Sequence, residues 1–339
     1  MGKRAKTSLD SIAEWSNLVQ AAYRAARGKR FRPEVTAFLA DLDRNLAAMR
    51  SGILADTVSL GPSSEFHIRD PKPRIIRAPC FRDRVLHHAI MAHVGPELDR
   101  ALIADTFACR VGKGTLAAVQ RCQEHIRRFP WYAKLDIRGY FASIDHAVLK
   151  TQLASRFASR RLLRLLGRII DSHDEGQSKG LPIGALTSQH FANSYLDPCD
   201  RFLLETCRVA GVIRYMDDFV FWDTSCVRVK QVVHQVQSFV SCELKLLVKE
   251  SVQINRSTSG ITVCGYRVFP GTIRLAPSRR RRYVEVKERW EALYLDGRIN
   301  ASELQRGIAA AVAITTHADA ATWRRREQTR NRSTWDESV

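Results

Sequence analysis

The chain has 339 residues, of which 45% are hydrophobic, and 54 basic against 35 acidic side chains give it a net charge of +19. This length can bury two or three subdomains around one continuous core, and the excess of cations favours a polyanionic partner such as nucleic acid. No long apolar segment, signal-peptide pattern or Cys-x-x-Cys spacing is present, so we expect no membrane partner, no zinc site and no disulfide framework, and a reducing cytoplasmic location.

The first part of the chain predicts helices followed by extended pieces. Residues 8–50 are expected to form two helices, with Gly28 and Pro33 between them. Apolar residues at helical spacing define their faces, Ile12, Trp15, Val19 and Ala22 in the first and Phe38, Leu42 and Leu46 in the second. Residues 66–130 predict extended pieces and then helices. His87 and His88 have no acid or cysteine at a metal-binding spacing, so we interpret them as structural.

A single acid ends an apolar run in the middle of the chain. The run that includes Tyr132 reaches Asp136, and Gly139 then breaks the pattern. This order predicts a strand that ends at Asp136. Asp145 lies nine residues later, before His146 and a helix-like run, so we interpret it as an N-cap or structural acid.

Two adjacent acids lie between apolar runs farther along the chain. Residues 212–222 predict two short strands, with Asp217 and Asp218 where they turn. One interpretation is a surface turn, because Asp is common in turns. The other is a metal site, because adjacent carboxylates need a cation nearby and suit Mg²⁺. With Asp136 on a neighbouring strand, such acids can hold two metal ions roughly 3.5–4 Å apart for in-line phosphoryl transfer.

In their order, these segments resemble the reverse transcriptase family. Tyr-Met-Asp-Asp at 215–218, preceded by Leu-Asp-Ile-x-x-x-Phe at 135–141, resembles the catalytic palm of these enzymes. The remaining matches are residues 71–76, 81–84 and 107–115 to the fingers, 179–196 to the loop and helix between the catalytic strands, and 264–268 to the primer-grip hairpin. The ordered matches run from about residue 66 to 270.

The resemblance implies an α+β fold, a right-hand polymerase with fingers, palm and thumb. Its expected parts are an N-terminal helical segment beside the fingers at 1–65, fingers at 66–130, a palm of antiparallel sheet backed by helices at 131–270, and a helical thumb with a basic tail at 271–339. The thumb has a candidate core face formed by Trp290, Leu293, Leu304, Ile308 and Val312.

The segment at residues 179–196 indicates which group of reverse transcriptases the chain resembles most. Ile183 stands where group II intron and retron enzymes usually have Gln, and Gln189 stands where they have Pro. This pattern resembles the reverse transcriptases of diversity-generating retroelements. It implies copying of a template-repeat RNA into cDNA with errors at adenines, and a separate, oligomeric accessory variability protein. The alternatives are a retron, group II intron-like or phage-defence reverse transcriptase, or a catalytically inactive RNA-binding scaffold.

The resemblance also assigns the catalytic acids. Asp136 and Asp217 are expected to hold two Mg²⁺ ions, for which Mn²⁺ could substitute, and the backbone carbonyl of Ile137 is expected to add a ligand. Asp218 is expected beside the metals, either as a direct ligand or as a neighbour. The alternative for all three acids is ordinary turn and cap chemistry.

Further residues are expected at the incoming dNTP. Phe141 corresponds to the steric gate against a ribose 2′-OH, although a core aromatic is the simpler interpretation. Arg74 and Lys72 are expected at the triphosphate, and the alternative is a solvated basic face. The remaining expected contacts are Ile183, Gly184 and Lys249. Lys249 is about one place from the family's usual spacing, so it is either the equivalent of the palm lysine or the equivalent is absent.

Two arginine runs flank the expected thumb. Arg279, Arg280, Arg281 and Arg282 form the first, and Arg324, Arg325 and Arg326 form the second. Both are candidates for gripping phosphates along the duplex of template RNA and the primer or cDNA. A solvated helix face or a contact with a protein partner is the alternative for either run.

Overall fold

The computed structural model describes residues 4–69 and 73–330. The N-terminal part holds four helices where the sequence predicts two, because the chain leaves helical geometry at Ala13 and again at Asp41, whose φ is −121° and ψ is 47°. The helices are α1 (Leu9–Ile12), α2 (Trp15–Ala26), α3 (Pro33–Ala40) and α4 (Leu42–Ala55). Ile12 is buried, whereas Trp15 is 42% exposed, which corrects its predicted place on the same helical face as Ile12. The break at Ala13 makes Trp15 the first residue of a new helix and so rotates it off the face of Ile12.

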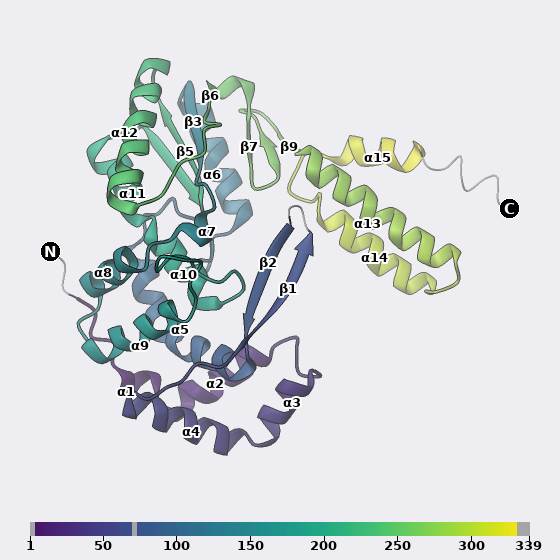
Figure 1. Ribbon diagram of the computed structural model, residues 1–339. Coiled ribbons are helices and arrows are strands. Elements are labelled where there is room, and N and C mark those ends of the chain that lie inside the picture. The colour runs from purple at the N-terminus through teal and green to yellow at the C-terminus, as the bar shows by residue number, and fades with distance from the viewer. Residues whose placement is uncertain (1–3, 70–72, 331–339) are drawn as a thin grey trace.

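A long antiparallel hairpin follows these helices. Strand β1 (Ser63–Arg69) pairs with β2 (Pro73–Pro79), and the hairpin projects toward the C-terminal helices (Figure 1). Helices α5 (Phe81–Ala101) and α6 (Thr115–Arg128) come next, so the predicted order of extended pieces and then helices is confirmed. His87 is buried in α5, and burial lowers its pKa to about 4, which fits a structural role.

A four-stranded antiparallel sheet, in the order β4-β5-β3-β6, forms the middle of the fold. The strands are β3 (Trp131–Asp136), β4 (Gly211–Tyr215), β5 (Asp218–Asp223) and β6 (Gln253–Arg256). Side chains alternate between the faces of a strand. Leu135 and Phe221 therefore enter one hydrophobic core, and Tyr132 and Trp222 enter a second. Helix α12 (Cys226–Leu244) packs in the first core and α6 in the second.

Short helices connect the strands that carry the candidate acids. They are α7 (Tyr140–Ser143), α8 (His146–Arg156), α9 (Arg160–Asp171), α10 (Leu186–Tyr195), α11 (Asp197–Arg201) and a π-helix, η1 (Phe202–Thr206). Asp145 accepts hydrogen bonds from the Val148 N–H and from Lys245 Nζ, each at 3.0 Å. Its predicted role as the N-cap of α8 is therefore confirmed.

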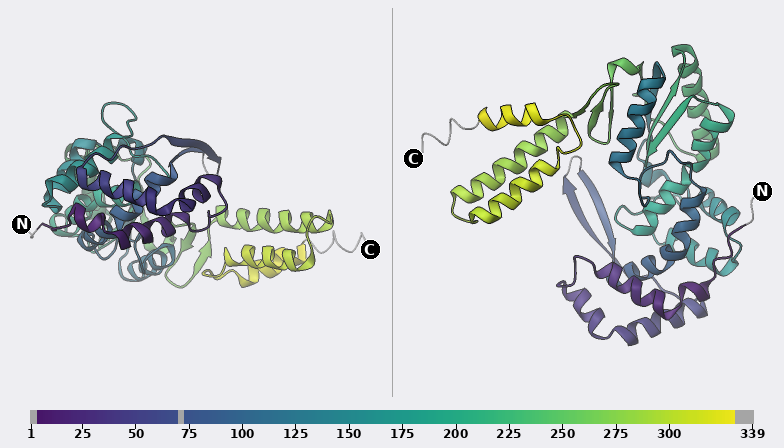
Figure 2. Two further views of the ribbon diagram at one scale, coloured as in Figure 1. Left: turned by 90° about the horizontal axis from the view of Figure 1, so that it is seen from below. Right: turned by 180° about the vertical axis from the view of Figure 1, so that it is seen from behind.

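The C-terminal part combines a small sheet with helices. Strands β7 (Ile261–Val263), β8 (Tyr266–Val268) and β9 (Ile273–Leu275) form an antiparallel sheet, and the helices α13 (Pro277–Leu295), α14 (Ala301–Ala313) and α15 (Ala321–Arg330) follow. Helices α13 and α14 lie side by side and extend away from the rest of the molecule (Figure 2). A Cβ on Gly307 would lie 2.1 Å from the Trp290 ring, so only glycine permits this close packing. The five residues of the predicted core face are all half-buried.

Within the described part of the chain, no helix combines the length and the apolar character needed to cross a bilayer.

Candidate active site

The candidate acids meet at one end of the central sheet. Strands β4 and β5 are joined by the two residues Met216 and Asp217, and Tyr215 pairs with Asp218. Asp218 is also the register partner of Asp136 at the end of β3. Met216 has a φ of 58°, a left-handed conformation that costs a non-glycine residue about 1 kcal/mol or more. The hairpin that the sequence predicts is thus present, with Asp217 in its turn and Asp218 beginning the second strand.

The acidic side chains of this cluster repel one another. Burial raises the pKa of the Asp217 carboxyl, and the charges of Asp218 and Asp136 raise it further. Two ammonium groups offset the negative charge. Lys249 Nζ donates a hydrogen bond to Asp136 Oδ2, and Lys134 Nζ lies 3.4 Å from Asp218 Oδ1. The cluster therefore concentrates negative charge in a half-buried place, which is the condition under which carboxylates bind cations.

Lys249 reaches Asp136 because of the backbone around it. Helix α12 ends at Leu244, and the φ of 50° at the next residue, Lys245, turns the chain back toward β3. The N–H of Lys249 then donates to the Asp136 carbonyl at 2.8 Å, and the N–H of Arg138 donates to the Leu247 carbonyl at 2.7 Å. The chain thus places Lys249 at the candidate catalytic acids despite its unusual spacing. The side chain of Ile137 is buried, and its carbonyl takes no part in these two hydrogen bonds.

Lys134 was not among the residues singled out from the sequence. It lies two positions before Asp136, so the alternation of a strand places both side chains on one face. This alternation is the signal that could have identified it. Lys134 Nζ also donates to the Thr262 carbonyl at 3.0 Å, which ties β3 to β7.

The oxygen ligands of Asp136, Asp217 and Asp218 suit a hard divalent cation by their chemistry. In residues 4–69 and 73–330, however, no group of three or more His, Cys, Asp or Glu side chains is arranged to hold one ion. Lys249 and Lys134 are paired with two of the three carboxylates. A metal ion that binds Asp136 would thus either displace the Lys249 ammonium from this carboxylate or bind it alongside that ammonium.

A buried network behind the hairpin fixes its tip. Arg214 is fully buried and donates to both carboxylate oxygens of Asp200, at 2.7–2.9 Å. It also donates to the Asn193 side chain at 2.9 Å and to the Met216 carbonyl at 3.0 Å. Burial lowers the pKa of Arg214, but Asp200 more than offsets this, and the net pKa is raised. The guanidinium therefore stays charged, and it holds the turn that presents Asp217.

The loop before α10 contains Ile183 and Gly184 and bonds to the backbone of Phe141, which are three of the residues predicted to contact the nucleotide. The Ile183 carbonyl accepts a hydrogen bond from the Arg77 N–H of β2 at 2.8 Å, and the Leu181 N–H donates to the Phe141 carbonyl at 2.8 Å. Gly184 has a φ of 125°, and a Cβ there would lie 2.8 Å from Ile76. Only glycine fits where this loop crosses β2. Ile183 is half-buried and Gly184 is exposed.

Phe141 and Arg74 differ in their surroundings. Phe141 is half-buried, packs against the main hydrophobic core, and meets the Tyr140 ring edge-on at 5.7 Å between centroids. Arg74 lies exposed on β2, opposite Ile68. Lys72 lies outside the described residues. The structure thus brings Phe141 and Ile183 together through one loop, and places Arg74 on the strand against which that loop packs.

The geometry agrees with a sequence comparison. Residues 68–255, more than half of the chain, match the family described as reverse transcriptase (RNA-dependent DNA polymerase). The chain belongs to the reverse transcriptase family. The description of this family names RNA-dependent DNA polymerases, a class that generally uses divalent metal ions. No curated protein sequence gives a significant match.

Solved structures confirm the reverse transcriptase fold. Apo telomerase from Candida tropicalis has a TM-score of 0.52 at 11% identity, over 76% of this chain and 57% of that one. Telomerase from the same organism, in complex with the TWJ fragment of telomeric RNA, has a TM-score of 0.50 at 12% identity, over 76% of this chain and 53% of that one. This reverse transcriptase thus spans little more than half the length of these telomerases. The expected α+β class of helices and antiparallel sheets is confirmed.

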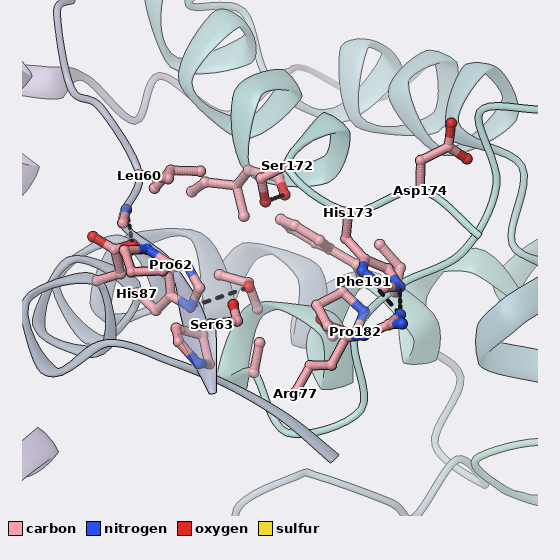
Figure 3. A pocket seen from close by; sticks show the side chains of 18 of the residues that line it. Leu60, Pro62, Ser63, Arg77, His87, Ser172, His173, Asp174, Pro182 and Phe191 are labelled. Carbon is pink, nitrogen blue, oxygen red and sulfur yellow. Dashed lines mark hydrogen bonds between the residues drawn. The ribbon is translucent and has the colours of Figure 1, made fainter. Parts of the chain in front are cut away.

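A pocket of about 420 Å³ lies beside the Ile183 loop of the reverse transcriptase (Figure 3). Leu60, His87, Pro182 and Phe191 line it, and the three candidate catalytic acids do not. Arg77 points to His173 at its edge, and its guanidinium also bonds to Glu65 and Glu175. Arg77 is a second residue that sequence reasoning missed. It joins the β1–β2 hairpin to the segment that leads into the Ile183 loop.

Each arginine run contains half-buried residues, which contact other side chains, and exposed residues. Arg279 lies 4.3 Å from the centroid of the Tyr266 ring and donates to its hydroxyl at 2.9 Å. Arg280 lies 5.5 Å from the Trp323 ring, and Arg324 bonds to Thr315. The exposed members are Arg281, Arg282, Arg325 and Arg326. Arg281 and Arg282 line a concavity of about 740 Å³ together with Arg69 of the β1–β2 hairpin and Arg289.

Proposed function

We propose that this reverse transcriptase copies RNA into DNA at the acid that ends β3 and the two acids at the β4–β5 turn. The observation that supports this most strongly is the register of Asp136 opposite Asp218, with Asp217 in the adjoining turn. In the proposed division, residues 1–65 flank the fingers, 66–130 form the fingers, 131–270 the palm and 271–339 the thumb with its basic tail.

The reaction is nucleotidyl transfer. The primer 3′-oxygen forms a bond to the α-phosphorus of a dNTP, the bond to the bridging oxygen breaks, and pyrophosphate leaves. Asp136 and Asp217, with the Ile137 carbonyl and Asp218 beside them, would hold two Mg²⁺ ions, or Mn²⁺ in their place. The bound ions supply activation of the attacking oxygen and neutralise charge on the leaving side. Lys249 and Lys134 would offset part of the negative charge of the acids when no ion is bound.

The chain's other residues select and orient the nucleotide. The Phe141 ring limits the space for a 2′-OH, and the Ile183–Gly184 loop borders the base and sugar. Arg74, together with Lys72, would contact the triphosphate, since a guanidinium fits phosphate oxygens in a bidentate way. The β1–β2 hairpin that carries Arg74 is fastened to this loop through Arg77, so movement of one would displace the other.

In our proposal, its biological role is to serve as the reverse transcriptase of a diversity-generating retroelement. Ile183 and Gln189 distinguish the loop from that of group II intron and retron enzymes. The substrate would be a template-repeat RNA, the product a cDNA with errors at adenines, and an oligomeric accessory protein would be a partner. The telomerase that aligns with this fold is described with an RNA fragment, which is in keeping with an RNA partner here.

Sequencing of cDNA tests the two levels of this proposal separately. The purified protein is supplied with dNTPs, Mg²⁺ and RNA transcribed from the region next to its gene, with and without the accessory protein. Synthesis that depends on Asp217 supports the polymerase assignment. Errors concentrated at template adenines support the retroelement role, whereas accurate cDNA with the accessory protein present would leave a retron-like or phage-defence enzyme. Absence of synthesis on any primed RNA would indicate an inactive RNA-binding scaffold.

A further inference from the structure

The turn between α2 and α3 presents cations and aromatic rings together. From Trp15 to Pro33 the chain has no acidic residue, and it has five basic ones, namely Arg24, Arg27, Lys29, Arg30 and Arg32. Phe31 in the middle of the turn is fully exposed, and Tyr23 is 47% exposed. The Arg30 guanidinium lies 5.9 Å from the centre of the Tyr23 ring. We call these five cations, with Tyr23 and Phe31, the basic turn surface.

The first acid that follows this surface in the sequence offsets only part of its charge. Glu34, which follows the turn, is bonded to Arg84. Arg24 bonds to the neutral Gln20 at 3.3 Å. Partial burial lowers the pKa of Lys29, and the charges of Arg84 and Arg32 lower it further. The turn therefore has a positive local potential, for which an anionic ligand would compensate.

The fold does not need these side chains in order to form the turn. Backbone hydrogen bonds define it, from the Lys29 N–H to the Ala26 carbonyl at 2.9 Å and from the Arg32 N–H to the Lys29 carbonyl at 3.1 Å. Gly28 supplies a positive φ of 70°, and Pro33 starts α3. A single exposed aromatic residue is ordinary on a protein surface. Two exposed rings among five cations are a composition that suits a ligand with both phosphates and bases.

We propose that the basic turn surface binds single-stranded RNA that lies outside the template–primer duplex. The cations would contact backbone phosphates, and the Phe31 and Tyr23 rings would stack on unpaired bases. A duplex would satisfy the cations but hides its base faces, so the rings favour a single strand. Helices α1–α4 and the β3–β6 sheet lie at opposite ends of the molecule (Figures 1 and 2), so this surface is separate from the candidate catalytic acids. The inference rests on membership of the family and not on the retroelement role.

Binding by the full-length protein tests this proposal with two probes of equal length, an unstructured single-stranded RNA and a blunt RNA–DNA hybrid. Phe31→Ala should weaken single-strand binding about fivefold or more, because one stacked base is lost, and leave hybrid binding near the wild-type value. Arg30→Glu should weaken binding of both probes. The matched controls are Val227→Ala and Lys230→Glu on α12, both at exposed positions, and neither should change binding.

Primer extension separates this surface from the active site. On a preannealed hybrid with a one-nucleotide template overhang, Phe31→Ala should extend as fast as wild type, whereas on a long unpaired template it should fall behind. Unchanged single-strand binding in both turn variants overturns the proposal. The proposal is also overturned if Phe31→Ala loses as much affinity for the hybrid as for the single strand, or if it extends the short-overhang hybrid more slowly than wild type. Either result would indicate that Phe31 has a structural role.

Discussion

Asp217 is the residue on which the proposed chemistry depends most. Asp217→Asn should abolish dNTP incorporation, since a neutral amide cannot supply the charge that holds a divalent ion at a phosphoryl-transfer site. Burial and the neighbouring acids raise the pKa of Asp217, so the ionised side chain opposes folding at neutral pH. Removal of its charge should therefore leave the free energy of unfolding equal or higher. Primer extension in Mg²⁺ and urea denaturation measure the two effects, with the exposed Asp43→Asn as a control. Normal extension by Asp217→Asn would refute the site.

Phe141 should determine the choice of sugar. Phe141→Ala removes the ring from the space that a 2′-OH would need, so discrimination between dGTP and rGTP should fall at least about tenfold, or about 1.4 kcal/mol. Single-nucleotide extension measures this ratio, and Phe141→Leu serves as a bulkier control. The hydrogen bond from Leu181 uses the Phe141 backbone, so it survives the substitution. An unchanged ratio would mean that Phe141 is only a core aromatic.

Ile183 should influence fidelity. A glutamine here could form an oriented polar contact with the incoming nucleotide, worth about 0.5–1.5 kcal/mol, that isoleucine cannot make. Ile183→Gln should therefore lower misincorporation, most visibly opposite template adenine. Only the backbone carbonyl of Ile183 bonds to Arg77, and the side chain is half-exposed, so the loop can accept the change. Sequenced cDNA from wild type, Ile183→Gln and the apolar control Ile183→Val decides the matter. An equal or higher error rate in a folded, active Gln variant would contradict the prediction.

At the scale of elements, the β4–β5 hairpin depends on the buried pair of Arg214 and Asp200. Arg214→Met should lower the free energy of unfolding by about 3–5 kcal/mol, because it leaves the buried Asp200 carboxylate without a cation, with only the Thr106 hydroxyl still donating to it. The double variant Arg214→Met, Asp200→Leu should regain most of this stability. It should still polymerise slowly, because the hydrogen bond to the Met216 carbonyl, which supports the turn of Asp217, is gone. Urea denaturation and primer extension give the two readouts. Full activity in the double variant would show that the pair stabilises the fold without positioning the hairpin.

Local sequence patterns predicted helices and strands correctly where a single short-range feature, such as an apolar run or a capping residue, marked them. The strands predicted from the apolar runs around Asp217, and the capping position of Asp145, both formed as expected. The N-terminal helices did not, since the breaks at Ala13 and Asp41 carry no glycine or proline to announce them. Helical periodicity continues across such breaks, so Trp15 was expected on a buried face that the break then rotated away.

At the scale of the whole molecule, the net charge of +19 should make nucleic-acid binding strongly dependent on salt. Arg281 and Arg289 line one concavity with Arg69, between the β1–β2 hairpin and α13. If they contact phosphates of the template–primer hybrid, Arg281→Gln and Arg289→Gln should each reduce the slope of log affinity against log salt by about 1. Titration of a labelled hybrid at several salt concentrations measures the slope, with the exposed Arg44→Gln on α4 as a control. Wild-type slopes in both variants would place the duplex elsewhere.

The sequence by itself determined the ordered segments of a reverse transcriptase, and it identified Asp136, Asp217 and Asp218 as the candidate catalytic acids. Residue types, their order and the two-residue period of strands are local properties, and a single chain displays them fully. Only the tertiary structure decided the partners of these residues. Lys249 reaches Asp136 through a left-handed turn after α12, and Arg77 and Arg214 support the site through contacts with residues distant in sequence. Such pairings depend on how helices and strands pack, and no spacing within the chain encodes them.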